Sequence, residues 1–210
     1  MSIEVLGISG SPIENSNTDR LIQAVLDATE LEFEFVKLSQ INIRPCLACK
    51  QCVPDNICKV KDDFPELAER IKKAKALIIG AYIPYKQIDG FTKALLERFW
   101  SLRHVNNLLR GKLCATVLTY LSPDAADNVN QSLATELKEM ERMELIGRRE
   151  FIGTIAGGMA AGGAYHEKIQ TPIVGRHDVI VCGSTGGQRQ NPPTPAQCQT
   201  VTEIALEPER

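Results

Sequence analysis

The fold class of this chain follows from the stretch IEVLGISGSPIENSNT, residues 3–18. Its first part, residues 3–8, is apolar apart from Glu4, which is typical of a strand buried on both faces of a parallel sheet. The glycine, serine, proline and asparagine residues that follow are those of a tight turn, and a helix is expected from about Thr18. In open α/β sheets, ligands bind where such a strand ends and the next helix begins. The stretch therefore predicts a strand, a ligand-binding loop and a helix.

Apolar runs and amphipathic helices continue to alternate along the chain. Further strands are expected at 31–38, 76–81 and 113–121, and helices at 18–28, 63–73 and 90–103. A long helix, with Ser122 as its N-cap and Pro123 at its first position, is expected to run to about Ile146. Of two short apolar segments, 151–155 and 179–182, one is enough to complete the sheet.

This order of elements predicts one α/β domain over residues 1–210. We expect a doubly wound parallel sheet of five strands with helices on both faces. A cysteine-rich loop at about 45–60 follows the second strand, and a C-terminal tail covers about 188–210.

Composition excludes several classes of protein. The 210 residues are 43% apolar and 24% charged, as in soluble globular chains, and the formal net charge is −2. A chain without an excess of basic residues lacks the positive charge that typically attracts nucleic acid. No apolar run approaches the roughly 18 residues that span a membrane. We expect no signal peptide and a cytoplasmic location. The seven cysteines are then thiols or metal ligands rather than disulfides.

Hydroxyl and amide side chains crowd the loop after the first strand. Six of them lie between positions 9 and 18: Ser9, Ser11, Asn15, Ser16, Asn17 and Thr18. With the backbone N–H groups of a helix N-terminus, they suit a phosphate group. The loop lacks the lysine of a P-loop and the G-x-G-x-x-G of a dinucleotide site, which disfavours ATP and classical NAD binding. An ordinary turn with an N-cap uses the same residue types, so both interpretations stand at this point.

The loop resembles the phosphate loop of the flavodoxin-like NADPH-dependent FMN reductase family, on the residues Gly7-Ile8-Ser9-Gly10-Ser11-Pro12 and Ser16-Asn17-Thr18. The resemblance extends over about residues 1–155. It implies a flavodoxin-like fold and an FMN cofactor whose phosphate is bound by Ser9, Ser11, Ser16, Asn17 and Thr18. Family members commonly have a basic residue just after the Ser-Pro pair, where this chain has Ile13 and Glu14. Hydroxyl groups, backbone N–H groups and the helix dipole are then expected to hold the phosphate.

Four of the seven cysteines fall within thirteen residues: Cys46, Cys49, Cys52 and Cys58. Overlapping C-x-x-C turns can bring three thiolates to neighbouring corners of a cubane, and the fourth cysteine can bind its last iron. Structural zinc sites more often use two C-x-x-C pairs separated by a longer insert, although zinc also accepts four thiolates. A [4Fe–4S] cluster is the favoured interpretation, with zinc or unligated thiols as the alternatives. No second ligand set is left among the scattered remaining cysteines, Cys114, Cys182 and Cys198.

The C-x2-C-x2-C-x5-C arrangement after the second strand resembles that of the archaeal and bacterial iron–sulfur flavoproteins, a branch of the same family. The resemblance implies that these four cysteines bind one [4Fe–4S] cluster in a protein that also binds FMN. It also implies flavin contacts from the loops after the third and fourth strands, at Tyr82, Ile83, Pro84, Tyr85, Thr119 and Tyr120. Lys86 stands where family members have a glycine. Lys93 and Arg98 fit the family's Lys-Ala-x-x-x-Arg register and are expected to be exposed helix charges.

The leading hypothesis is a flavin-dependent oxidoreductase that transfers electrons between a donor and an acceptor through FMN and the cluster. The resemblance implies reduced ferredoxin or NAD(P)H as the donor and a small molecule or an oxygen species as the acceptor. Because the cofactors carry the chemistry, no catalytic side chain is assigned. The alternatives are an NAD(P)H-dependent FMN or quinone reductase whose cysteines hold zinc or no metal, and a non-enzymatic redox-sensing or interaction module. A homodimer or homotetramer is expected, since a partner subunit would shield an oxygen-sensitive cluster.

Overall fold

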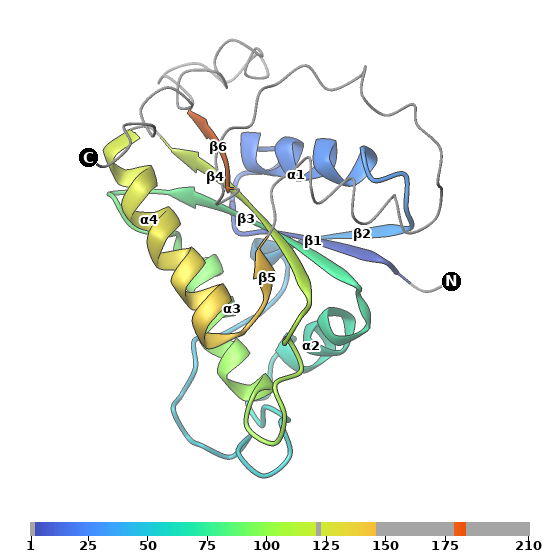
Figure 1. The fold of residues 1–210 in the computed structure, drawn as a ribbon. Coiled ribbons are helices and arrows are strands. Elements are labelled where there is room, and N and C mark those ends of the chain that lie inside the picture. Colours follow the sequence, from blue (N-terminus) through green and yellow to red (C-terminus); the bar gives the residue numbers. More distant parts are fainter. Residues whose placement is uncertain (1–2, 121–122, 146–178, 184–210) are drawn as a thin grey trace, which may run out of the picture.

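The computed structural model describes residues 3–120, 123–145 and 179–183 (Figure 1). The strands in these ranges are β1 (Val5–Ser9), β2 (Phe33–Lys37), β3 (Ala76–Ile83), β4 (Leu113–Tyr120), β5 (Glu144–Leu145) and β6 (Val179–Gly183). The α-helices are α1 (Asn17–Asp27), α2 (Phe64–Lys73), α3 (Gly90–Phe99) and α4 (Pro123–Thr135). Short 3-10 turns follow β2 and α3, at Leu38–Gln40 and Trp100–Leu102, and a π-helical turn follows α4, at Glu136–Met140.

The strands form one parallel sheet in the order β2-β1-β3-β4, with β5 and β6 both paired to β4. β5 lies beside Leu113–Cys114 and β6 beside Thr116–Tyr120, so the two short strands share the fifth position of the sheet. The register pairs Ser9 of β1 with Gly80 of β3, and Tyr82 of β3 with Thr119 of β4. The carboxyl ends of the central strands therefore meet at one edge, and the predicted flavodoxin-like fold is confirmed.

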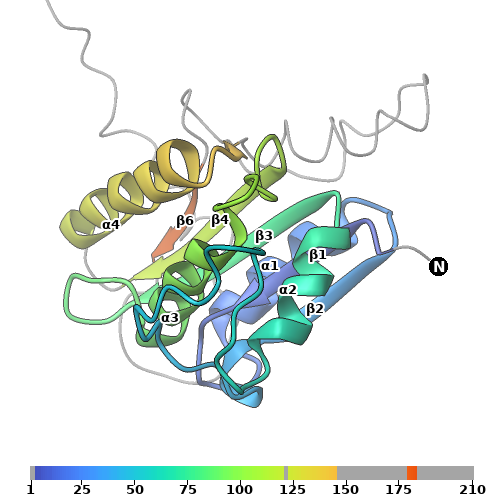
Figure 2. The same cartoon turned by 90° about the horizontal axis from the view of Figure 1, so that it is seen from below.

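Helices cover both faces of the sheet (Figures 1 and 2). α1 packs on one face, where Ile22 joins the core that also contains Ile78 of β3. α2, α3 and α4 pack on the other face, with Leu77 and Ile79 of β3. Successive residues of one strand thus enter opposite cores, as strand geometry requires. Because both faces are buried, the central strands are mostly apolar, which is why continuous apolar runs predicted them.

The region after α4 differs from the sequence-based prediction. The helix expected to reach Ile146 ends at Thr135, passes through the π-helical turn and gives way to β5. The backbone N–H of Glu144 donates to the carbonyl O of Lys112, and Gly111 donates to Arg142, so pairing with the start of β4 replaces the helical pattern. The candidate strand 179–182 is confirmed as β6. The other candidate, 151–155, and the expected N-cap Ser122 lie outside the described residues.

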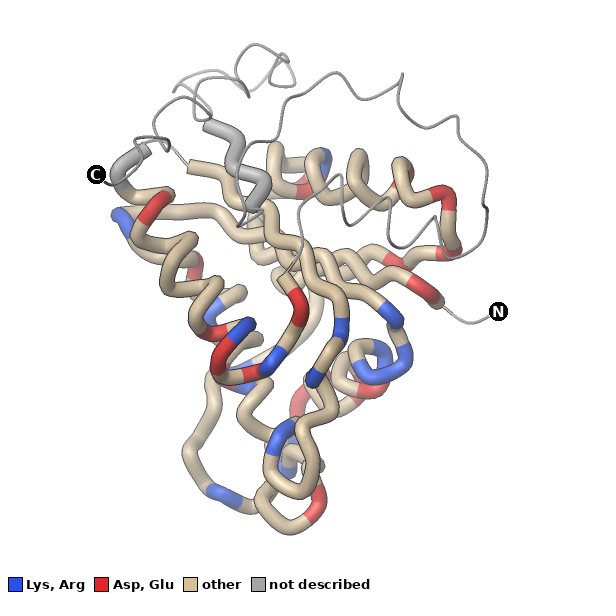
Figure 3. Tube along the Cα trace, in the orientation of Figure 1, with Lys and Arg blue, Asp and Glu red and all other residues tan. Residues whose placement is uncertain are grey.

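Charges of both signs are interspersed along the described part of the chain (Figure 3). Among these residues, no helix is long and apolar enough to cross a membrane.

Candidate functional site

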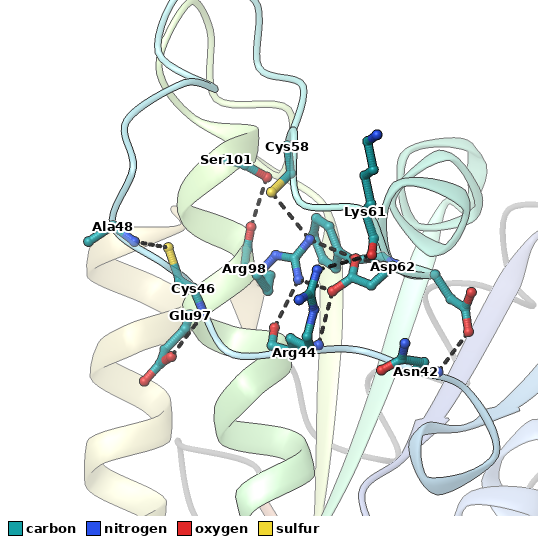
Figure 4. A network of polar contacts seen from close by, with 12 residues as sticks. Asn42, Arg44, Cys46, Ala48, Cys58, Lys61, Asp62, Glu97, Arg98 and Ser101 are labelled. Atoms are coloured by element: carbon teal, nitrogen blue, oxygen red, sulfur yellow. Dashed lines mark hydrogen bonds and ion pairs between the residues drawn. The ribbon is translucent and has the colours of Figure 1, made fainter.

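The cysteine-rich loop, residues 45–60, lies between β2 and α2 in the chain and against the C-terminal end of α3 in space (Figures 2 and 4). One pocket is lined by all four predicted ligands: Cys46, Cys49, Cys52 and Cys58. Cys52 is buried, Cys49 is exposed, and the other two are partly buried. The structure therefore gathers on one pocket the four thiols that the sequence singled out.

The electrostatics of Cys52 reflect this convergence. Burial raises the pKa of the Cys52 thiol above its ordinary value, and the charges of Cys58, Cys46 and Cys49 raise the pKa further. Four thiolates at one pocket repel one another unless a positive group joins them. A bound metal group removes that repulsion, because its charge replaces the protons of the thiols.

Tight turns bring the cysteines together. Ala48, Lys50 and Asn56 have positive φ angles of 51°, 58° and 57°, a left-handed conformation that costs a non-glycine residue roughly 1–2 kcal/mol. The buried Asn56 side chain ties the loop to the segment after α3. Its amide donates to the carbonyl O of Asn106 at 2.7 Å, and its oxygen accepts from the N–H of His104 at 2.7 Å. The strained turns are thus tied to the segment that follows α3.

The lining of the pocket fits a group bound by thiolates. Besides the cysteines it carries the cations of Lys50, Lys59 and Arg98, and no histidine or carboxylate. Within the described ranges, no three or more histidine, cysteine, aspartate or glutamate side chains are arranged to hold a single metal ion. A cubane requires a different arrangement, because each cysteine binds its own iron rather than one shared ion. The donor set is therefore compatible with a [4Fe–4S] cluster.

Arg98, in the last turn of α3, is buried, so the prediction that it is an exposed helix charge was wrong. Its Nη1 donates to Asp62 Oδ2 at 2.5 Å and to the carbonyl O of Arg44 at 2.8 Å (Figure 4). Its Nη2 donates to Asp62 Oδ1 at 3.0 Å and to Cys58 Sγ at 3.2 Å. The guanidinium also lies over the Phe64 ring, 4.4 Å from its centroid. Arg98 therefore links α3 directly to a predicted cluster ligand.

Asp62 is the anion that allows Arg98 to be buried, and neither side chain has exposed surface. Burial alone would raise the pKa of Asp62, but the Arg98 guanidinium and the N–H groups of Arg44 and Phe64 hold it below its ordinary value. The pair is therefore ionised at neutral pH. Because Arg44 precedes the cysteines and Phe64 begins α2, this network fixes both ends of the loop. The family register pointed to Arg98, whereas no sequence signal pointed to Asp62.

The predicted flavin site lies at the carboxyl ends of β1, β3 and β4. The hydroxyls of Thr18 and Thr119 form a hydrogen bond of 2.7 Å, which joins two predicted contacts that are 101 positions apart in the chain. Ser16 caps α1: its Oγ accepts from the N–H of Asp19 at 3.1 Å, and its own N–H donates to the Asp19 carboxylate at 3.0 Å. The positive end of the α1 dipole therefore faces the loop, where it favours an anion.

Three other predicted phosphate contacts already have partners within the protein. Ser9 is fully buried, and its hydroxyl donates to Asp19 Oδ1 at 2.5 Å. The buried Ser11 Oγ accepts from the N–H of Ile13 at 3.4 Å. Asn17, the first residue of α1, accepts from Arg20 at 2.8 Å through its side-chain oxygen. These contacts hold the loop in shape.

A cation that sequence reasoning passed over lies behind this loop. Lys37, at the end of β2, is buried, and its Nζ donates to Asp19 Oδ2 at 2.5 Å and to the carbonyl O of Ile13 at 2.8 Å. It brings a positive charge to the loop in which Ile13 and Glu14 replace the family's basic residue. In the sequence, its position at the end of the second strand was the feature that could have pointed to this role, because a dinucleotide-binding fold has an acid there.

The loop after β3 packs against the phosphate loop. Asp89, the N-cap of α3, is fully buried and accepts from the N–H of Thr92 at 2.7 Å and of Tyr82 at 3.2 Å. Burial raises the pKa of Asp89, while its hydrogen bonds lower it in part. Gly10 lies directly on this cap, and a Cβ there would overlap the Thr92 hydroxyl and the Asp89 carboxylate. Only glycine permits this close approach.

The remaining predicted ring contacts differ widely in exposure. Tyr82 and Pro84 are half-buried, and Tyr85 is fully exposed. Two further contacts are packed into the core, Ile83 and Tyr120. Tyr85 and Lys86 have positive φ angles of 38° and 65°. Lys86 occupies the family's glycine position, so the turn keeps a conformation that favours glycine.

α3 joins the two candidate cofactor sites (Figure 2). Its N-cap, Asp89, accepts from the N–H of Tyr82 at the predicted flavin site, and its last turn carries Arg98 at the cysteine pocket. A helix of ten residues rises about 15 Å. Within one chain, the two sites therefore lie about one helix length apart.

The fold and these two sites define a flavodoxin-like α/β protein with a thiol-lined pocket. The chain belongs to the NADPH-dependent FMN reductase family, whose model matches residues 3–158. An iron–sulfur flavoprotein of Methanocaldococcus jannaschii is 31% identical over 118 residues, which cover 55% of this chain and 61% of the relative. One from Methanosarcina thermophila is 30% identical over 118 residues, covering 55% and 62%. These relatives support the predicted iron–sulfur flavoprotein branch of the family, and the chain matches about three-fifths of their length.

Solved structures agree on the fold. RosB superposes with a TM-score of 0.54 at 16% identity, covering 68% of this chain and 61% of that chain. Smu.1420 from Streptococcus mutans superposes with a TM-score of 0.52 at 14% identity, covering 74% and 97%. At these identities the likeness concerns the fold alone.

Glu141 follows the π-helical turn and lines a largely apolar pocket next to the cysteine loop, together with Cys46 and Trp100. Its side chain is 1% exposed. Oε1 accepts from Arg103 at 3.1 Å, and Oε2 has no hydrogen-bond partner among the described residues. Burial raises the pKa of Glu141 to about 7, with Arg103 opposing the shift and Glu136 adding to it. Protonation of this carboxyl therefore falls near neutral pH.

We expect Glu141→Gln to stabilise the protein above pH 7 relative to the wild type. Because the folded pKa of about 7 exceeds the ordinary value of 4.5, the folded state retains a proton that the unfolded state loses. The stability from this proton is fully present below about pH 4.5 and is lost as the pH rises through 7. Urea denaturation at pH 6 and pH 8 should show a loss about 1 kcal/mol larger in the wild type than in the variant.

Glu139 is exposed and lies two positions before Glu141. The variant Glu139→Gln is the matched control, and its stability should depend on pH as that of the wild type does. Equal pH dependence in the wild type and Glu141→Gln would contradict the assignment.

Proposed function

We propose that this protein is a flavin-dependent oxidoreductase that transfers electrons between a donor and an acceptor through FMN and one [4Fe–4S] cluster. The donor is reduced ferredoxin or NAD(P)H, and the acceptor is a small molecule or an oxygen species. The observation that carries the proposal is the single pocket lined by four cysteines at the end of α3. Family membership supports the flavin, and the names of the iron–sulfur flavoprotein relatives support the cluster.

The cofactors supply the redox chemistry in this proposal, and the chain holds them and sets their surroundings. FMN takes up one or two electrons and the cluster one at a time, so together they join or split electron pairs. The proposed flavin contacts are Ser9, Ser11, Ser16, Asn17, Thr18, Tyr82, Ile83, Pro84, Tyr85, Thr119 and Tyr120. The proposed cluster ligands are Cys46, Cys49, Cys52 and Cys58.

An absorbance spectrum of protein purified without oxygen tests the proposal against its alternatives. Flavin bands together with broad iron–sulfur absorption are the expected result. Flavin alone would favour an NAD(P)H-dependent FMN or quinone reductase whose cysteines hold zinc or no metal. Neither signal would favour a non-enzymatic redox-sensing or interaction module.

The bound flavin is expected to be FMN, because the loop is sized for one terminal phosphate and lacks the G-x-G-x-x-G of a pyrophosphate site. Ser11→Ala and Thr18→Ala should each weaken FMN retention about tenfold or more, because each loses a donor to a dianion. Equilibrium dialysis measures the retention, and chromatography of heat-released flavin identifies it. Thr135→Ala, which removes a hydroxyl on the exposed side of α4, is the control. Recovery of FAD would contradict the prediction.

Replacing any one of the four loop cysteines by alanine should remove most of the iron and acid-labile sulfide and leave the flavin bound. The reason is that the phosphate loop lies on another element, about one helix length away. Cys114 is fully buried in β4 and does not line the cysteine pocket, so Cys114→Ala should keep its iron, and we expect the same of Cys182 and Cys198 variants. Iron and sulfide analysis on anaerobic protein decides the matter, and stoichiometric zinc without labile sulfide would indicate a structural zinc loop.

The cysteine loop also supports the proposal of a homodimer or homotetramer. Four large apolar side chains near the pocket are exposed: Leu47, Val53, Ile57 and Trp100. Their exposed fractions, from 41% to 61%, leave apolar surface beside the proposed cluster that a partner subunit would cover. Light scattering on the anaerobic full chain should therefore report a multiple of the 23.2 kDa monomer mass. A stable monomer at micromolar concentration would count against the proposal.

A further inference from the structure

One hydrogen bond distinguishes Cys58 from the other cysteines of the loop. Among the described residues, it is the one member of the four whose sulfur accepts from a charged side chain, Arg98 Nη2, at 3.2 Å. Cys46 Sγ accepts from the backbone N–H of Ala48, at 3.4 Å. An ionised donor makes a hydrogen bond about twice as strong as a neutral one. Cys58 is therefore the ligand whose charge the protein stabilises most directly.

The Arg98 guanidinium is held so that it cannot turn away from this sulfur. Asp62 accepts from both Nη1 and Nη2, which fixes the plane of the group, and the Phe64 ring covers one of its faces. The carbonyl O of Arg44 takes a further N–H. Arginine stays protonated in proteins, and the site excludes water, since Arg98 is 1% exposed. The N–H···S contact therefore lies in a poorly solvated environment.

We propose that Arg98 is a positioning residue that fixes Cys58 and raises the reduction potential of the cluster through this charge-assisted hydrogen bond. The inference rests on the proposed function. Reduction adds one electron to the cluster and none to the protein, so the negative charge at the sulfurs increases. A fixed N–H donor stabilises the reduced form more than the oxidised form, and hydrogen bonds to sulfur are a recognised control of potential.

A lysine in place of Arg98 cannot reproduce all of these hydrogen bonds. Its ammonium is a point charge on a flexible stem, whereas the guanidinium fork reaches Asp62 with two N–H groups and Cys58 with a third. Arg98→Lys retains the charge and weakens the geometry, and Arg98→Gln removes the charge. The two variants therefore separate the contribution of charge from that of the fixed donor.

The experiment uses the full chain purified without oxygen and measures iron, sulfide, flavin and the midpoint potential of the cluster. Arg98→Gln should make cluster reduction at least tenfold less favourable, which is about 59 mV for one electron. Arg98→Lys should fall between this variant and the wild type. Lys93→Gln removes an exposed cation from the same helix without a contact to any cysteine, and it should leave the potential unchanged.

Three results would overturn the inference: wild-type potentials in both Arg98 variants, the same fall in Lys93→Gln, or loss of iron from both Arg98 variants with the flavin retained. The last would make Arg98 a structural brace alone. Failure of the proposed function is distinguishable, because the wild-type protein would then contain no iron–sulfur cluster.

Discussion

A guanidinium without exposed surface must be paired, and the pairing of Arg98 determines how the cysteine loop is held. Removing a charge from water costs several kcal/mol, which is offset only when partners and hydrogen bonds are well placed. Asp62 provides the opposite charge, and its remaining hydrogen-bonding capacity is used by the N–H groups of Arg44 and Phe64. One ion pair therefore fixes both ends of the cysteine loop, at Arg44 before the cysteines and at Phe64 where α2 begins. Between them the loop can follow tight left-handed turns with little core of its own.

α3 extends this constraint to the other end of the molecule. Its N-cap, Asp89, is packed on Gly10 of the loop after β1 and accepts from the N–H of Tyr82 near the end of β3. Its last turn bears Arg98. A displacement of the helix would disturb both candidate sites, but their ligands come from separate elements, so either site can lose its ligands without loss of the other. This combination of a shared support and separate ligands suits a protein whose two redox groups need a fixed spacing.

The parts of the fold that depend on local pattern were predictable from the sequence. Buried parallel strands produce continuous apolar runs, so β1, β3 and β4 were found within a few residues. The convergence of Cys46, Cys49, Cys52 and Cys58 followed from their spacing. The end of α4 was not predictable, because pairing of Glu144 with Lys112 is a long-range contact that overrides helical periodicity. Arg98 was misjudged for the same reason: an arginine on a helix is usually exposed, and its burial depends on Asp62, thirty-six positions away.

The predicted phosphate loop shows how a missing charge in a motif can be balanced from elsewhere. Asp19 completes the capping box of α1, but its carboxylate occupies the helix end where an anion would bind. Lys37 neutralises that carboxylate, and the hydroxyl of Ser9 donates a hydrogen bond to it. Lys37 is buried, and two of its three N–H groups donate to Asp19 and to the carbonyl O of Ile13, so its charge acts first on the Asp19 carboxylate. Its effect is therefore to cancel a repulsion, and attraction for a phosphate is left to backbone N–H groups, hydroxyls and the helix dipole. The lysine from β2 and the family's basic residue thus serve the same loop in physically different ways.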